Sequence, residues 1–169
     1  MNFSHRQLGH IARRGIISQG GLKLVGPDWT WPYLGEVVDR MPHAGSPQVS
    51  RGGLKIRNWK HQPGVATYLS DLGLAGGWQE GRPQVDAGLA RSAEFWLGLL
   101  EVNQQCAGLR DIRVATSKEV LEQFAEFVGE LVPSWKGAPF LFRGKWSCLV
   151  QGKMRVVFWE EINRRAAGF

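Results

Sequence analysis

The chain has few of the residues that cross-link small folds or bind metals. Its 169 residues include two cysteines and four histidines. Cys106 and Cys148 are too few for a disulfide scaffold and lack the C-x-x-C spacing of metal or redox sites. His5 and His10 are five residues apart, off the spacing that places two ligands on one helix face. We therefore expect no cofactor or metal, and two buried thiols in a reducing cytoplasm.

Long apolar runs are missing as well. No stretch approaches the ~20 apolar residues that a membrane span needs, so we expect no membrane partner. Residues 1–6 carry charge with no apolar run behind them, which argues against a secretory signal. These absences predict a cytoplasmic protein.

Recognisable catalytic motifs are the third absence. The glycine pairs at 20–21, 52–53 and 76–77 have neither the strand–loop–helix context nor the Lys-Ser/Thr of a phosphate-binding loop. The sequence therefore predicts a protein that is not an enzyme. An enzyme that acts on an anionic substrate through scattered residues stays open as an alternative.

What the chain does have is charge arranged in blocks. Residues 1–61 contain nine Lys/Arg and three Asp/Glu, residues 62–138 six and ten, and residues 139–169 six and two. The segments thus carry +6, −4 and +4, which gives the net charge of +6. Segregated positive charge attracts polyanions. We expect the partner to be nucleic acid, or else an acidic or nucleic-acid-binding protein.

Length and composition favour a single globular domain over residues 1–169. The chain is 43% apolar and 21% charged, and a chain of this size buries roughly two-thirds of its unfolded surface. Residues 42–53 are rich in proline, glycine and serine, which predicts a flexible loop.

Capping residues and apolar periodicity predict the elements. Residues 4–7 have the form of a capping box, before a helix that ends near Arg14. Thr116 begins a second capping box, before a helix that ends near Leu131. We expect further helices over residues 32–41, 63–74 and 83–105, and strands over residues 22–25, 54–59 and 112–115.

The C-terminal region gives the clearest fold signal. Two x-Gly-Lys-x turns, at residues 143–146 and 151–154, lie eight residues apart between apolar runs. Glycine at the first loop position suits a type II′ hairpin turn. The pattern predicts a three-stranded β-meander over residues 139–143, 146–151 and 154–159. The expected fold class is α+β, with helices packed on a small antiparallel sheet.

The register of that meander predicts a binding face. Two-residue loops would align one arginine and two tryptophans across the three strands, with Phe140, Phe142 and Leu149 on the core side. Aromatic rings beside cations suit single-stranded nucleic acid, at about 1–3 kcal/mol for each stacked base. The alternative is a purely structural role, because cross-strand tryptophans also stabilise sheets. The candidate binding residues here are Arg143, Lys145, Trp146, Lys153, Arg155 and Trp159.

A second candidate patch lies on the strand after the loop. Basic residues alternate there with an aromatic on one strand face, and the alternative is an edge strand protected from aggregation by its charges. The candidates are Arg51, Lys55, Arg57, Trp59 and Lys60. The earlier Arg13–Arg14 pair is interpreted as a charge match to the C-terminal end of its helix.

Together these patterns predict a small basic, non-enzymatic protein that binds nucleic acid through phosphate contacts and aromatic stacking. The alternative is a protein-binding module or inhibitor, phage or mobile-element encoded, that docks its basic and tryptophan surface on an acidic or nucleic-acid-binding partner. An acidic strip on the helix over 116–131 could also pair with the basic ends of a second copy and cause self-association. Its residues are Glu119, Glu122, Glu126 and Glu130.

Overall fold

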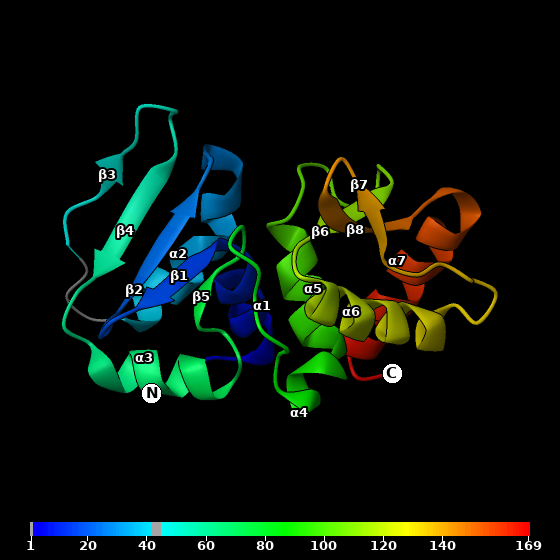
Figure 1. The fold of residues 1–169 in the computed structure, drawn as a ribbon, viewed down its shortest axis with the longest axis horizontal. Helices are drawn as coiled ribbons and strands as arrows, with labels where there is room; N and C mark the ends of the chain where they lie inside the picture. Colours follow the sequence, from blue (N-terminus) through cyan, green and yellow to red (C-terminus); the bar gives the residue numbers. More distant parts are fainter. Residues whose placement is uncertain (1, 42–44) are drawn as a thin grey trace.

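The computed structural model describes residues 2–41 and 45–169, arranged as two sheets on either side of a central helix pair (Figure 1). All strand pairings are antiparallel. The elements in chain order are α1 (His5–Arg14), β1 (Gly15–Ser18), β2 (Gly21–Gly26), η1 (Asp28–Thr30), α2 (Trp31–Arg40), β3 (Gln48–Val49), β4 (Lys55–Trp59), α3 (Pro63–Asp71), β5 (Gly76–Gly77), α4 (Ala87–Ala90), α5 (Ala93–Glu101), β6 (Ile112–Ala115), α6 (Lys118–Leu131), β7 (Phe140–Phe142), β8 (Lys145–Val150) and α7 (Gly152–Ala166).

Helices α1 and α5 form the centre of the molecule and run side by side in the same direction. Each begins at a serine cap: Ser4 accepts from Gln7 N–H, and Ser92 accepts from Phe95 N–H. At the other end, the Nε of Arg13 donates to the side-chain oxygen of Asn103 at 2.9 Å. Because both helices end together, the segments that follow them meet at one place.

The two sheets differ in size. The first sheet has the strand order β3-β4-β2-β1-β5, and the second sheet has the order β6-β8-β7. Helices α1 and α3 contact strands of the first sheet, and α6 contacts β8 of the second sheet. One cluster of buried apolar side chains runs from the first sheet through the helix pair to α7. Each sheet therefore has one face covered by helices and one face left open.

The chain contains an internal structural repeat. The order α1-β1-β2-α2-β3-β4-α3 in the first half is matched by α5-β6-α6-β7-β8-α7 in the second. Strand β6 pairs with β8 as β2 pairs with β4, so the counterpart of β1 is the missing element. Residues 102–111 lie in its place, and Gln104 fastens this loop by hydrogen bonds to the backbone of Asp111 and Arg113.

The α+β class expected from the sequence is confirmed, as are most of the elements. The capping boxes introduce α1 and α6, although the cap of α6 is Ser117, one residue later than expected. The helix expected over 83–105 is divided into α4 and α5, because Ser92 caps a new helix there. Cys148 is buried, but Cys106 is exposed at a backbone φ of 59° in the loop after α5, which corrects the expectation of two buried thiols.

The third strand of the expected meander is wrong, because residues 152–166 form helix α7. Met154, Phe158 and Ile162 recur every four residues, and Phe158 and Ile162 are buried. That spacing suits a helix as well as a strand, and burial against α5 and α6 decides in favour of the helix. The third strand of the second sheet is β6, which pairs with β8.

The β7–β8 hairpin exists, but its loop is one residue earlier than expected. The loop residues are Arg143 and Gly144, and Phe142 pairs with Lys145. Arg143 and Gly144 have backbone φ angles of 50° and 77°. Positive φ at both loop positions is the signature of a type I′ turn, not type II′. Trp146 therefore lies opposite Leu141, and the expected row through Arg143, Trp146 and Trp159 does not form.

The loop expected near residues 42–53 is only partly described. Residues 42–44 lie outside the described residues, and Gln48–Val49 pairs with β4 as a short edge strand. In the ranges 2–41 and 45–169, no helix combines the length and hydropathy that crossing a membrane requires. Nor do those ranges contain a group of three or more His, Cys, Asp or Glu placed to hold a metal ion.

Candidate nucleic-acid interface

The open face of the first sheet differs from the face expected from the sequence. Trp59 is 1% exposed and lies opposite Leu22 on the helix-covered face, which also includes Arg57. Lys23 and Asn58 pair on the opposite, open face and are half-buried. The expected alternation along β4 is present, but its aromatic side faces the core. Trp59 is thus a core residue and is not available to stack on a base.

The second sheet shows the same inversion. Cys148 and Val150 are both fully buried, and Trp146 shares their face and lies under the Nζ of Lys118 at 5.0 Å. The expected core side is the open one, where Phe142 is 42% exposed. Arg113 lies over the Phe142 ring at 5.0 Å to its centroid. The side chains of this open face are Arg113, Ala115, Phe140, Phe142, Lys145, Ser147 and Leu149.

Three of the predicted binding residues stay exposed in the loops and strand end beside the open faces: Arg51, Arg143 and Lys145. Lys55 is exposed but engaged by Asp28 at 3.0 Å, and Lys60 is exposed just after β4. The remaining three lie on α7 and join neither open face: Lys153, Arg155 and Trp159. The structure therefore brings the predicted residues into separate places and not into one patch.

A groove of about 630 Å³, here the central groove, lies between the two halves. It is lined from the first half by Arg13, Trp78 and Glu80, and from the second half by Ser117 and Lys145. A second hollow of about 260 Å³ shares Arg13, Trp78 and Glu80 with it and extends to Ile16 and Val25 on the open face of the first sheet. The two open faces are thus connected past the end of α1.

Arg13 and Arg14 occupy this connection. The Nε of Arg14 donates to the backbone carbonyl of Val102 at 2.7 Å. The Nε of Arg13 donates to the side-chain oxygen of Asn103. Arg13 lies over the Trp78 ring at 5.4 Å, and Arg14 lies over Trp29 at 5.5 Å. Burial, together with the positive charge of Arg14, lowers the pKa of Arg13 to about 9. Burial also lowers the pKa of Arg14.

Arg82, which is not among the residues predicted from the sequence, holds the end of α1 in place. It is 1% exposed, and its guanidinium donates to six backbone carbonyls. Three belong to the end of α1 and the residue after it (Ile11, Ala12 and Gly15), and three to residues 74–76. Helix C-termini leave such carbonyls without intrahelical partners. A single arginine between distant segments has no local sequence pattern by which it could be found.

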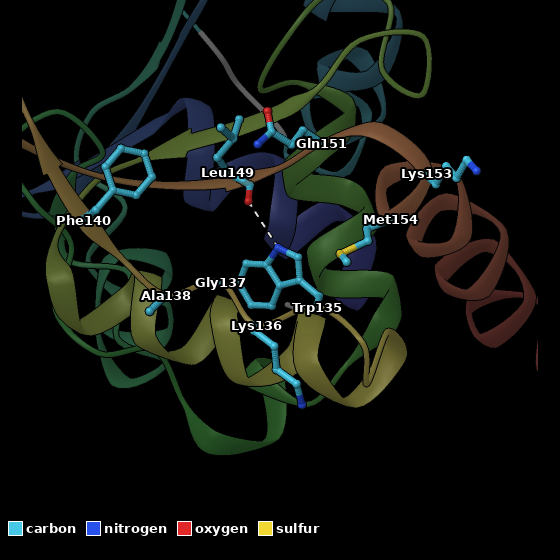
Figure 2. A pocket seen from close by; sticks show the side chains of 9 residues that line it. All are labelled: Trp135, Lys136, Gly137, Ala138, Phe140, Leu149, Gln151, Lys153 and Met154. Atoms are coloured by element: carbon cyan, nitrogen blue, oxygen red, sulfur yellow. Dashed lines mark hydrogen bonds between the residues drawn. The ribbon is translucent and has the colours of Figure 1, made fainter.

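Another hollow, of about 490 Å³, lies at the edge of the second sheet (Figure 2). Trp135 lies in it and donates its Nε1–H to the carbonyl of Leu149 at 3.3 Å. Lys136 and Lys153 belong to its lining, but in Figure 2 both side chains point away from the Trp135 ring. Because its polar groups do not converge, this hollow is a weaker candidate site than the central groove.

Charge is segregated between the faces of the second half. The exposed residues Glu119, Glu122, Glu126 and Glu130 lie on α6, which covers the inner face of the second sheet. The open face has Arg113 and Lys145. The blocks of charge in the sequence thus become an acidic helix on one side and a basic sheet face on the other.

No protein-family model and no curated protein matches this sequence. Solved structures match its fold over nearly the whole chain. The homing endonuclease I-WcaI bound to its DNA recognition sequence superposes with a TM-score of 0.58 at 10% identity, over 97% of this chain and 83% of that one. The N-terminal LAGLIDADG domain of DUF199/WhiA gives 0.57 at 13%, over 95% and 84%. Mesophilic variants of the homing endonuclease I-DmoI give 0.57 at 12%, over 98% and 95%. The likeness shows a shared LAGLIDADG-type fold.

Proposed function

We propose that this protein binds double-stranded DNA across the open faces of both sheets and the central groove between them. The observation that carries the proposal is the continuity of this surface. It runs from Lys23 on the first sheet, past Arg13 and Arg14, to Lys145 and Arg113 on the second. A basic surface that spans two sheets can follow a phosphate backbone.

The similar structures support this proposal. One of them, I-WcaI, is a homing endonuclease solved on its DNA recognition sequence, and it has the same fold over most of both chains. A shared fold alone does not establish a function. Here the fold and the placement of charge agree, because the acidic residues of α6 lie on the helix layer and leave the open face basic.

The residues at the ends of α1 and α5 favour a protein that binds DNA without cleaving it. The name LAGLIDADG, read as one-letter codes, has glycine third and ninth and aspartate sixth and eighth. Residues 7–15, QLGHIARRG, have both glycines but Ala12 and Arg14 at the aspartate positions. Asn103 lies at the corresponding end of α5. Metal-assisted phosphodiester cleavage relies on carboxylate ligands, and the carboxylate at the end of α5, Glu101, is already bound by Arg6 and His10.

Phosphate contacts dominate over base stacking in this proposal. Trp59 is buried, and the half-buried Trp146 lines the central groove but lies under the Nζ of Lys118, so neither offers an uncovered ring face to a base. The one large aromatic ring of the described open faces that is more than a third exposed is Phe142, and it lies beneath Arg113 and Arg143. These guanidiniums present charge outward, which favours a duplex backbone over splayed single strands.

The test is a fluorescence-anisotropy titration of a mixed-sequence duplex at several salt concentrations. Arg113→Gln and Lys145→Gln should each reduce the salt slope by about 0.9, since one phosphate contact is lost. Arg91→Gln is the matched control, because Arg91 is exposed before the N-terminal end of α5, at the far end from the groove. No binding at low salt would contradict the proposal, and so would equal effects of all three changes.

A separate assay tests whether the protein cleaves DNA. The duplex is incubated with the protein and Mg²⁺, and the strands are examined by denaturing electrophoresis. We expect intact strands. Mg²⁺-dependent nicking that disappears with a heat-inactivated sample would overturn the non-enzymatic part of the proposal while leaving binding in place.

An acidic protein partner is the second candidate, and it would dock on the edge strand β7, beside the open face of the second sheet. Leu141 is 60% exposed on the edge strand β7, next to Phe142 and Arg143. Exposed apolar side chains beside arginine are typical of protein interfaces. Under this alternative, Leu141→Ser should weaken capture of an acidic partner while duplex binding is unchanged or absent.

A further inference from the structure

The guanidiniums of Arg13 and Arg14 are anchored in a way that leaves their outer nitrogens free. The Nε of each arginine donates a hydrogen bond to a residue just after α5: Asn103 accepts from Arg13, and Val102 accepts from Arg14. In the described part of the chain, neither makes a hydrogen bond through its terminal nitrogens, and both side chains are half-buried. Trp78 and Trp29 lie against them and restrict their orientation. Both arginines line the second hollow, so two fixed forks of donors border the same space.

The positive charge at this place is not balanced by the protein. Among residues 2–41 and 45–169, no carboxylate lies within ion-pair distance of Arg13 or Arg14. Glu80 lines the central groove with Arg13 but is exposed to solvent. The negative end of the α1 dipole is no counter-charge either, because Arg82 already occupies its carbonyls. Half-buried charges without a partner are costly unless a ligand neutralises them.

We propose that Arg13 and Arg14 form a phosphate-binding site in the second hollow, which adjoins the central groove at Arg13. Its physiological ligand is a backbone phosphate of the bound duplex, so this assignment rests on the proposed function. The site itself is an anion site. Paired guanidiniums bind phosphate oxygens through parallel hydrogen bonds, and their fixed orientation reduces the entropy lost on binding.

The site can be tested without DNA by titrating inorganic phosphate at low ionic strength. The readout is the ¹H–¹⁵N spectrum of the arginine Nε–H groups. We expect the Arg13 and Arg14 signals to shift saturably and together. The exposed Arg51 is the internal reference and should shift slightly and without saturation. Signals of Arg13 and Arg14 that follow Arg51 would overturn the proposal.

Two variants distinguish loss of the phosphate site from a folding defect. Glu80→Gln removes an exposed negative charge that lines both hollows with Arg13 and should tighten phosphate binding severalfold. Arg14→Gln should abolish saturable shifts at Arg13, because one guanidinium alone is a weak site. If Glu80→Gln leaves the phosphate affinity unchanged and Arg14→Gln leaves the Arg13 shifts intact, the assignment fails.

A DNA titration separates failure of the site from failure of the proposed function. The double variant Arg13→Gln/Arg14→Gln should reduce the salt slope by at least about 0.9, because the central phosphate contact is lost. Duplex binding with an unchanged slope would overturn the site and leave DNA binding intact. Saturable phosphate binding by a protein that binds no duplex would uphold the site and overturn the proposed function.

Discussion

Gly9 and Gly98 lie where α1 and α5 cross, and each meets the backbone of the other helix. A Cβ at Gly9 would overlap the carbonyl oxygen of Phe95, and a Cβ at Gly98 would overlap that of Arg6. The overlapping atoms belong to backbone, so they cannot swing aside. The pair therefore sets how closely the helices approach and where their C-terminal ends place Arg13 and Arg14.

Alanine at either central glycine should destabilise the fold. We expect Gly9→Ala or Gly98→Ala to cost about 3 kcal/mol or more in the free energy of unfolding, measured by urea titration, since overpacking outweighs the gain in helix propensity. Gly129 is the matched control, because it is also helical and a Cβ there meets no atom. Gly129→Ala should stabilise by about 0.5–1 kcal/mol. Equal effects at the three positions would contradict the close approach.

Arg82 should be essential for stability although it forms no ion pair within the described residues. Arg82→Ala removes a hydrogen-bond donor from six carbonyls, of which that of Ile11 still accepts from the N–H of Gly15, and we expect a loss of at least about 3 kcal/mol in urea unfolding. Arg82→Lys should recover part of this loss, because an ammonium has fewer donors. Arg110→Ala, at an exposed position, should change stability by less than about 0.5 kcal/mol.

Glu101 makes the contact between α1 and α5 sensitive to acid. Burial alone would raise the pKa of Glu101, but hydrogen bonds from Arg6 and His10 outweigh it and hold the pKa below 4.5. A carboxylate with a lowered pKa in the folded state stabilises above its unfolded pKa and loses that contribution as pH falls through its folded pKa. Glu101→Gln should therefore be less stable than the native chain at pH 7, and the difference in urea midpoint should shrink in acid. A difference that is independent of pH would exclude this role.

Trp59 should contribute to stability and not directly to binding. Trp59→Ala removes a fully buried ring, and we expect it to cost about 3–5 kcal/mol in the free energy of unfolding. Lys23→Gln, on the open face of the same sheet, should weaken duplex binding with little change in stability. Thermal unfolding and anisotropy titrations of the two variants check this division. A Trp59→Ala protein that is stable but fails to bind would reverse the assignment of faces.

The sequence was sufficient for features that depend on neighbouring residues. Ser4 with Gln7, and Ser117 at the start of α6, supply cap hydrogen bonds within one turn, so the helix starts could be predicted. Block charge likewise predicted a polyanion partner, which remains a proposal. The β7–β8 hairpin was predicted for the same local reason, although its loop was placed one residue late and its type was wrong, because arginine rarely has a positive φ.

Only the tertiary structure decided which face of each sheet is open. Alternation along a strand separates two faces but does not say which one the helices cover. Helix packing placed Trp59 and Trp146 toward the core and left Phe142 exposed, the reverse of what composition suggested. The proposed Arg13–Arg14 site also depends on tertiary packing. Its residues are adjacent in sequence, but their partners Asn103, Val102 and Trp78 are distant, and only the packing of α1 against α5 brings them together.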